Sequence, residues 1–185
     1  MAERNKPYTF SVSAEKGYKI TDVTVTVEGG TPLPVNKNAD GTYTVSVAEK
    51  AITVAATAEE ISYNLQLSYG QDKTRSLGSV KYSGLTTLTE ISNISDFNVP
   101  EHYEFLGWAT EDGGMPVYDD GASVSKLSTE DGATVTLYAI MRGEEYTVSG
   151  GTLISLEFAE EQDMTAHYGE DFVFAFKDSA GYYLD

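Results

Sequence analysis

The stretch Tyr103-Glu104-Phe105-Leu106-Gly107-Trp108 decides the fold of this chain, because it contains the only tryptophan. A glycine inside such a strand-like stretch indicates a bulge or a close approach of another backbone segment. A second strand-like stretch, Val135-Thr136-Leu137-Tyr138-Ala139, follows later in the chain. We predict that these two stretches form the centre of the middle module of a larger β-protein.

The composition indicates an all-β protein. The chain has 185 residues, 13 of them tyrosine, and Thr, Val and Ser recur in short alternating runs that suit half-buried strands. Residues 86–97 are the exception, because Leu85, Leu88, Ile91 and Ile94 recur at roughly helical spacing. This spacing predicts one short or irregular helix, which Pro100 prevents from continuing.

Residues 1–60 are predicted to form a first antiparallel module of about four strands. Asp40-Gly41 is a strong hairpin signal, and Pro32 and Pro34 exclude a central strand between them. The expected strand faces consist of Tyr8, Phe10 and Val12; of Val23, Val25 and Val27; of Tyr43, Val45 and Val47; and of Ile52, Val54 and Ala56.

A middle module over residues 61–143 and the start of a third over residues 144–185 are predicted to follow. Residues 8–12 and 17–18 match residues 172–176 and 181–182 at a constant offset, which indicates an internal repeat. The first module is expected to lack its front strands and the third its back strands. Two hypotheses follow: self-association, head to tail through these incomplete modules, or closure of the two half-modules on each other within one chain.

The formal net charge of -17 disfavours nucleic acid and anionic membranes as partners. The absence of cysteine excludes disulfides and thiolate metal sites. No apolar run is long enough to span a membrane, and the first residues do not resemble a signal peptide. If the protein is exported, its signal and anchor are expected outside this chain.

No motif for catalysis or for a cofactor is visible, and the sequence predicts a non-enzyme without a metal. His102 and His167 have no further ligands at metal spacing. The acidic turns Asp112-Gly113-Gly114 and Asp119-Asp120-Gly121 lack the spacing of a calcium loop. An amide bond between a lysine and an Asn or Asp side chain stays open, with Lys81, Lys126 and Lys177 in strand-like segments.

Two interpretations are open for Trp108. Its ring is either a platform for a sugar, with Tyr103 and Tyr118 as neighbouring candidates for ligand binding, or the large residue that fills a small core. Its position next to Gly107 favours the core. The other strand tyrosines pose the same question, and ordinary packing is favoured for them as well: Tyr63, Tyr69 and Tyr82.

The middle region resembles the Listeria-Bacteroides repeat family of bacterial surface proteins, which are small β-grasp-like modules strung in tandem. The resemblance covers about residues 61–141. It rests on Phe105, Gly107, Trp108 and Tyr118, on Asp120-Gly121-Ala122-Ser123-Val124, and on Leu137-Tyr138-Ala139. Ile140-Met141 stands where the family commonly ends its last strand with an aromatic residue, and Tyr69-Gly70-Gln71 replaces the usual Asn-Gly-Gly turn.

The first sixty residues are similar to another type of bacterial surface repeat. Its pattern is present at Gly17-Tyr18, Val23-Thr24-Val25, Asp40-Gly41-Thr42-Tyr43 and Ile52-Thr53-Val54. Both resemblances imply a spacer, stalk or adhesive segment of a secreted or cell wall-associated protein, whose partner is an unidentified surface protein or glycan. The alternative from another class is a carbohydrate-binding module that accompanies a secreted enzyme.

Overall fold

The protein is all-β, as predicted. The computed structural model describes residues 6–46, 51–70, 72–149, 155–158 and 165–177, and of residues 155–158 and 175–177 only the backbone. Val47, the side chain of Lys177 and the repeat residues 181–182 lie outside this part of the chain. Within it, no helix is long and apolar enough to cross a membrane.

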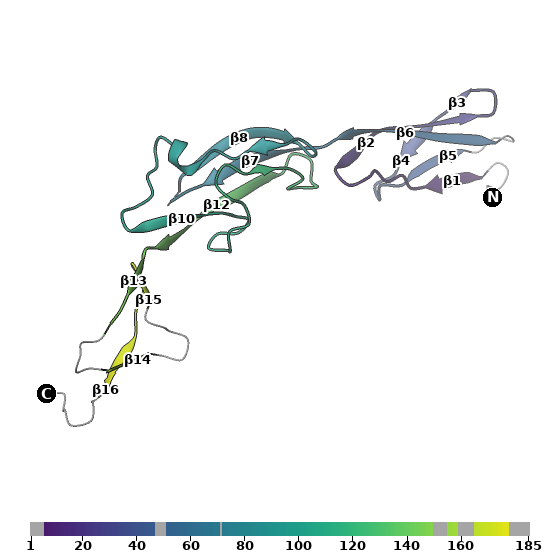
Figure 1. Ribbon diagram of the computed structural model, residues 1–185. Helices are drawn as coiled ribbons and strands as arrows, with labels where there is room; N and C mark the ends of the chain where they lie inside the picture. Colours follow the sequence, from purple (N-terminus) through teal and green to yellow (C-terminus); the bar gives the residue numbers. More distant parts are fainter. Residues whose placement is uncertain (1–5, 47–50, 71, 150–154, 159–164, 178–185) are drawn as a thin grey trace. The chain divides into compact units, whose positions relative to one another are not determined.

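Figure 1 labels most of the strands along the chain. In the first sixty residues they are β1 (Pro7–Phe10), β2 (Tyr18–Val27), β3 (Pro32–Leu33), β4 (Val35–Lys37), β5 (Tyr43–Ser46) and β6 (Ile52–Glu60). The middle of the chain contains β7 (Ser62–Ser68), β8 (Thr74–Lys81), β9 (Thr86–Thr87), β10 (Tyr103–Ala109), β11 (Ser123–Val124) and β12 (Thr134–Gly143). The last strands are β13 (Glu145–Thr147), β14 (Ser155–Phe158), β15 (Thr165–His167) and β16 (Phe174–Lys177).

The first sixty residues form two three-stranded sheets, β1-β5-β4 and β3-β2-β6. Their shared core is small: Val25 and Val45 are buried, and four half-buried residues pack against them, namely Phe10, Leu33, Val35 and Ile52. The Asp40-Gly41 turn joins β4 to β5 as predicted, with the Asp40 carboxylate accepting the Thr42 N–H at 3.0 Å. The two prolines take up edge positions, with Pro32 in β3 and Pro34 between β3 and β4.

Ile52, Val54 and Ala56 share one face of β6 as predicted, and of the three it is Ile52 that packs against the core. Val54 is 41% exposed, and Ala56 is exposed as well. The physical reason is length, because β6 pairs with β2 along nine residues while the strands of the facing sheet have three or four. Those short strands reach only the end of β6 at Ile52. The prediction that Val12 belongs to the first strand was wrong, since β1 ends at Phe10.

The middle of the chain forms a four-stranded sheet in the order β10-β12-β7-β8 and a two-stranded sheet of β11 and β9. Read from β8 to β10, this is the second, first, fourth and third strand along the chain, so the first and last strands are neighbours in the centre. β7 shows the predicted period of two, with Tyr63, Leu65 and Leu67 fully buried. The bulge predicted at Gly107 is confirmed, because the register between β10 and β12 shifts between Phe105 and Gly107.

The predicted helix over residues 86–97 is only a three-residue 3-10 turn, η1 (Ile91–Asn93). The apolar spacing did identify core residues, since Leu88, Ile91 and Ile94 are buried, whereas Leu85 is 76% exposed. The backbone around them is different because β9 pairs with β11 and Glu90 is extended, with ψ at 138°. Threonine and serine, which interrupt this segment, favour turns and strands over helix interiors.

The last strands form two separate two-stranded sheets, β13-β15 and β14-β16. Of the predicted repeat, residues 8–10 lie in β1, while of their counterparts at 172–174 only Phe174 is in β16. Among the strands that the structure describes, no sheet joins residues on both sides of position 61 or of position 144.

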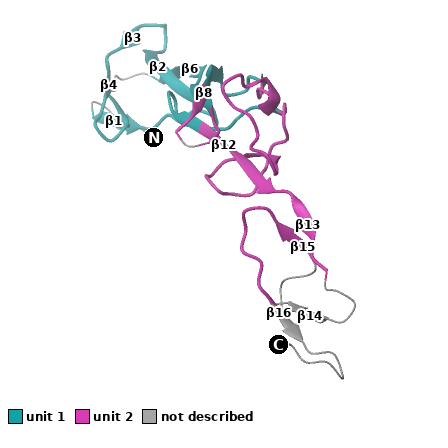
Figure 2. Cartoon of the chain, turned by 90° about the vertical axis from the view of Figure 1, so that its left-hand side faces the viewer, with its two compact units in different colours: residues 1–66, 76–86, 123–135 teal, residues 67–75, 87–122, 136–185 magenta. Residues whose placement is uncertain are grey.

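Contacts divide the chain into two compact units (Figure 2). The first contains residues 1–66, 76–86 and 123–135, and the second contains residues 67–75, 87–122 and 136–185. The predicted module boundary at 60/61 lies inside the first unit, and the boundary at 143/144 lies inside the second. Neither predicted boundary therefore coincides with the division of the chain into compact units.

Candidate functional site

The first boundary is a direct connection that we call the first junction, formed by Gly17, Lys19, residues 59–62, Tyr82 and Asp131. Ile61 alone separates β6 from β7, and its side chain is buried. Its N–H donates to the Gly17 carbonyl at 2.9 Å, and its carbonyl accepts the Tyr82 N–H at 3.0 Å. Both backbone groups of Ile61 are thus paired, one on each side of the boundary.

Gly17 makes the closest approach in the first junction. Its φ of +87° lies in the left-handed region, and a Cβ at this position would overlap the ring of Tyr82. Only glycine combines this backbone conformation with the absence of a side chain. Gly17 is therefore required for packing in the first junction. This requirement accounts for the glycine of the Gly17-Tyr18 repeat pattern.

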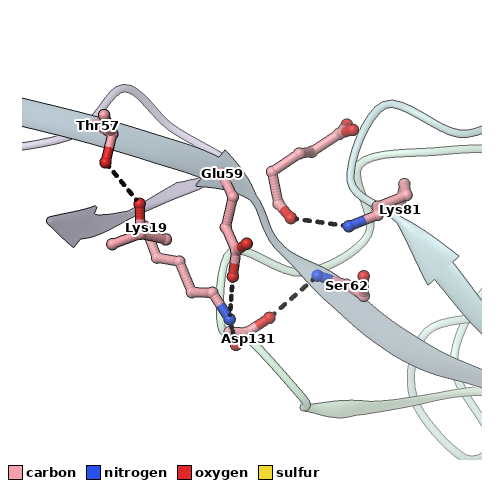
Figure 3. Close-up of polar contacts among 8 residues, drawn as sticks. Lys19, Thr57, Glu59, Ser62, Lys81 and Asp131 are labelled. Carbon is pink, nitrogen blue, oxygen red and sulfur yellow. Dashed lines mark hydrogen bonds and ion pairs between the residues drawn. The ribbon is translucent and has the colours of Figure 1, made fainter.

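Lys19 joins both sides of the first junction by ion pairs (Figure 3). Its Nζ lies 2.9 Å from a Glu59 carboxylate oxygen and 2.6 Å from Oδ2 of Asp131, which is 112 residues further along the chain. The hydrogen bond to Asp131, followed by the one to Glu59, raises the pKa of Lys19. The hydrogen bond from Lys19, followed by one from the Ser62 N–H, lowers the pKa of Asp131. The Lys19–Asp131 pair is fully charged above the ordinary carboxyl value of 3.8 and below the ordinary amine value of 10.5.

Three further polar contacts complete the first junction. Asp131 Oδ1 accepts the Ser62 N–H at 3.1 Å, so one carboxylate holds both Lys19 and the start of β7. The Glu60 carboxylate accepts the Ser83 N–H at 2.6 Å. The hydrogen bond with the Ser83 side chain, followed by the one from this N–H, lowers the pKa of Glu60. Lys81 donates to the Glu60 carbonyl at 3.2 Å (Figure 3). Charged acceptors of backbone N–H groups make strong hydrogen bonds, which keep these segments in register.

A lysine placed between two carboxylates resembles the arrangement needed for a side-chain amide bond. That chemistry requires an uncharged amine as nucleophile. The pKa of Lys19 is raised, and the side chains of Lys19 and Asp131 are 43% and 40% exposed, so the two groups form an ion pair. Of the predicted lysines, Lys81 donates to a backbone carbonyl, and the backbone N–H of Lys126 donates to the Tyr82 carbonyl.

The second boundary is formed by Gly143 and Glu144, which together with His102, Tyr146 and Tyr168 make up the second junction. The Glu144 N–H donates to the His102 carbonyl at 2.7 Å, and its carbonyl accepts the Tyr168 N–H at 3.0 Å. A Cβ on Gly143 would overlap the Tyr168 carbonyl. This junction therefore also combines a glycine at a point of close approach with backbone hydrogen bonds on both sides of the boundary.

The side chains of the second junction converge on the Glu144 carboxylate. Its Oε2 lies 3.1 Å from His102 Nδ1 and accepts the Tyr146 hydroxyl at 3.0 Å. The Tyr146 hydroxyl also lies 3.0 Å from the same imidazole nitrogen. The Tyr146 hydroxyl has a single proton, which it donates to Glu144. His102 can donate to Glu144 as well only when its Nδ1 carries a hydrogen. His102 Nε2 faces the Glu101 carboxylate at 3.7 Å, so both ring nitrogens face an acidic group.

A backbone turn places His102 in this position. The Tyr103 N–H donates to the Pro100 carbonyl at 3.1 Å, and His102 has a φ of +66°. A positive φ at the third position of such a turn is the signature of type II, and histidine is among the non-glycine residues that tolerate it. The imidazole packs against Tyr168 with ring centroids 4.8 Å apart, and Tyr168 in turn packs edge to face on Tyr103.

The second junction is expected to loosen in acid. Hydrogen bonds from His102, and then from Tyr146, lower the pKa of Glu144 from its ordinary value of 4.5. A lowered carboxyl pKa adds stability that is complete above pH 4.5 and is lost as the pH falls through the folded value. As the pH falls through the folded pKa of Glu144, the amides of Glu144 and Tyr168 should therefore exchange faster than the intrinsic pH dependence of amide exchange predicts. Glu144→Gln should remove this step, and Glu145→Gln should retain it; an unchanged step in Glu144→Gln contradicts the assignment.

The predicted ligand-binding residues occupy the interior and its edge. Trp108 is 0% exposed, and its ring packs edge to face on Phe105 with centroids 5.2 Å apart. Its backbone N–H donates to the Tyr118 carbonyl at 2.8 Å. Its Nε1–H has no hydrogen-bond partner among the described residues. Tyr103 and Tyr118 are half-buried. The indole of Trp108 thus has no surface on which a sugar could stack.

The other sequence candidates have structural contacts. Tyr63, Tyr69 and Tyr82 are buried. Asp120 Oδ1 accepts the Ile91 N–H at 2.8 Å and thereby holds the start of η1. His167 Nδ1 lies 3.2 Å from the Gly143 carbonyl, at the edge of the second junction. Among the residues that the structure describes, no three His, Asp or Glu side chains gather in a group that could hold a metal ion.

A groove of about 1140 Å³ lies in the second compact unit. It is lined by Ser68, Gly70, Asp72, Thr74, Asp112, Gly113 and residues 138–141. None of the predicted ligand-binding residues, Trp108, Tyr103 and Tyr118, is part of this lining.

Sequence reasoning missed the junction residues Lys19, Asp131 and Glu144. Lys19 and Asp131 are 112 residues apart, and no local pattern distinguishes them from the other charged residues. Gly17 and Gly143 were the available signal for the two junctions, because a glycine in or next to a strand often marks a close approach of another backbone segment.

Comparisons with known proteins find no match to this chain among protein-family models, curated proteins or solved structures.

Proposed function

We propose that this chain is a non-catalytic repeat segment of a bacterial cell-surface or secreted protein, in which it serves as a spacer, stalk or adhesive region. The observation that carries the proposal is the construction of the two junctions. One residue, Ile61, separates β6 from β7, and Glu144 alone separates β12 from β13. Flexible linkers of the Gly/Ser type would let neighbouring modules rotate freely. Paired backbone groups and packed glycines instead suit a segment that holds distance and direction.

Three further features support this proposal. The four central strands follow the spatial order second, first, fourth and third, which fits the β-grasp-like part of the resemblance to the Listeria-Bacteroides repeats. The net charge of -17 favours solubility at an exposed surface. The carbohydrate-binding alternative needs an exposed aromatic platform, and Trp108, its principal candidate, is buried.

Two experiments on the parent protein test this function. Antibodies against this chain should label intact bacteria that produce the parent protein, without lysis. Replacing residues 6–177 in the parent by an unrelated folded segment of similar length should preserve the display of its other regions. Labelling only after lysis contradicts the surface location, and loss of binding to a host or bacterial partner upon replacement favours an adhesive role over a spacer.

The first junction yields a more local prediction. Gly17→Ala introduces a Cβ into the ring of Tyr82 in addition to left-handed strain of roughly 1–2 kcal/mol. The amides of Ile61 and Tyr82, which pair across the boundary, should exchange with solvent at least about tenfold faster. Native-state hydrogen exchange measures this effect.

Gly41→Ala is the matched control for this substitution. Its φ of +84° nearly equals that of Gly17, at +87°, but no atom lies within 4 Å of its new Cβ. The control should therefore destabilise the β4–β5 hairpin and leave the amides of Ile61 and Tyr82 unchanged. Equal exchange rates at Ile61 in the two variants would show that the first junction does not depend on the Gly17–Tyr82 contact.

A further inference from the structure

The central strand pair of the four-stranded sheet runs parallel. β7 and β12 are neighbours in the sheet. The Gly132 N–H donates to the Ser62 carbonyl at 2.7 Å, and the Asn64 N–H donates to the Ala133 carbonyl at 2.8 Å. The partner residue advances from 132 to 133 as the first segment advances from 62 to 64, so the two segments run in the same direction, as parallel strands do. β7 and β12 therefore begin at the same end of the sheet.

The chain enters and leaves this sheet through these two strands. It enters at Ser62, directly after Ile61, and leaves at Gly143, directly before Glu144. Because the strands are parallel, the start of β7 and the end of β12 lie at opposite ends of the pair. Tension applied along the chain would pull the two strands in opposite directions along their own axes.

This geometry loads the hydrogen bonds between β7 and β12 in shear, so that several must break together. A hairpin pulled at its two open ends instead loses its bonds one after another. Side chains add resistance, because Leu65 and Leu67 of β7 and Leu137 of β12 are fully buried. A slip of one residue would turn these buried faces outward.

Hydrogen bonds and ion pairs of the two junctions hold the segments next to the start of β7 and the end of β12, so tension along the chain acts directly on these two strands. At the entry, Asp131 binds both Lys19 and the Ser62 N–H, immediately before the paired residues 132–133. At the exit, Glu144 is held through its N–H by His102, which precedes β10. β10 is paired with β12 from Tyr103 to Ala109, so the exit strand has hydrogen-bonded neighbours on both sides.

We infer that the middle sheet, residues 62–143, is a force-bearing element that resists tension along the chain. This property follows from the strand order and direction. It does not depend on the location or the partner of the parent protein, so a result that contradicts the proposed surface role would leave this inference unaffected, and the reverse also holds.

Single-molecule pulling in two directions tests the inference on the full chain. The chain has no cysteine, so pairs of introduced cysteines give unique attachment points. Ser62→Cys with Glu145→Cys applies shear to the β7–β12 pair, whereas Ser62→Cys with Glu130→Cys pulls the two strand starts apart. Trp108 fluorescence in both variants shows that the middle sheet is folded before pulling.

The shear pair should unfold at a several-fold higher force than the other pair, because forced unfolding reports the unfolding barrier in the direction pulled. At about 3.3–3.6 Å per extended residue, the segment between positions 62 and 145 spans roughly 270–300 Å when extended. Its unfolding step should lengthen the chain by this span less the distance between the two attachment points in the folded protein. A shear force equal to or below the force for separating the strand starts would overturn the inference, as would extension in small steps without a force peak.

Discussion

Trp108→Ala should unfold the middle sheet or cost about 3–5 kcal/mol of its stability, the range for truncating a buried aromatic residue. The indole is fully buried, packs against Phe105, and belongs to the strand that is bridged to Tyr118. Removing it leaves a cavity that the paired strands β10 and β12 cannot close without losing register. Urea unfolding followed by far-ultraviolet circular dichroism measures the loss, and hydrogen exchange locates it.

Trp108→Phe is the matched control for this prediction. It keeps an aromatic ring and removes an N–H that has no hydrogen-bond partner among the described residues. A buried donor without a partner is unfavourable, so its removal offsets part of the lost packing. The Phe variant should therefore retain most of the stability. Equal losses in the Phe and Ala variants would indicate that the indole N–H has a partner, and no loss in either would contradict a packing role for Trp108.

Gly107→Ala should cost at least about 2 kcal/mol, because two penalties combine. The φ of +135° is a conformation that costs a non-glycine residue about 1–3 kcal/mol. The new Cβ would also lie 2.6 Å from the Tyr118 carbonyl oxygen, which is a backbone atom and cannot rotate away. That carbonyl accepts the Trp108 N–H, so any displacement of Tyr118 weakens the hydrogen bond between these two residues. Thermal and urea unfolding both measure the loss.

Gly113→Ala separates the two penalties in Gly107→Ala. Gly113 also has a positive φ, +68°, but no atom lies within 4 Å of its added Cβ. The control variant should show the cost of backbone strain alone, roughly 1–2 kcal/mol. If Gly107→Ala costs no more than Gly113→Ala, the contact between Gly107 and Tyr118 is not a determinant of the bulge.

Local patterns predicted the strands well because each depends on neighbouring residues. The alternation of Tyr63, Leu65 and Leu67 gave the buried face of β7, and Asp40-Gly41 marked a hairpin turn. Gly107 predicted a bulge because few other residues permit that backbone. The same reasoning failed for residues 86–97, where apolar spacing identified buried side chains but a strand and a 3-10 turn replaced the helix.

The candidate sites could not be predicted in the same way. Trp108 was considered both as a sugar platform and as core, and only tertiary packing excludes water from its ring. Glu144 is one of 29 acidic residues, and nothing in its local sequence shows that His102 and Tyr146 meet at its carboxylate. Residues distant in sequence acquire a shared role only when the fold brings them together.

The sequence by itself determined that this is an all-β chain, where most of its strands and turns lie, and that Gly107 stands at a bulge. These features follow from side-chain periodicity and from the conformations open to single residues. Tertiary structure decided the pairing of β7 with β12, the burial of Trp108, and the ion pairs of Lys19 with Glu59 and Asp131. The physical reason is that strand order and long-range charge pairing depend on the packing of the whole chain, which no short stretch of sequence encodes.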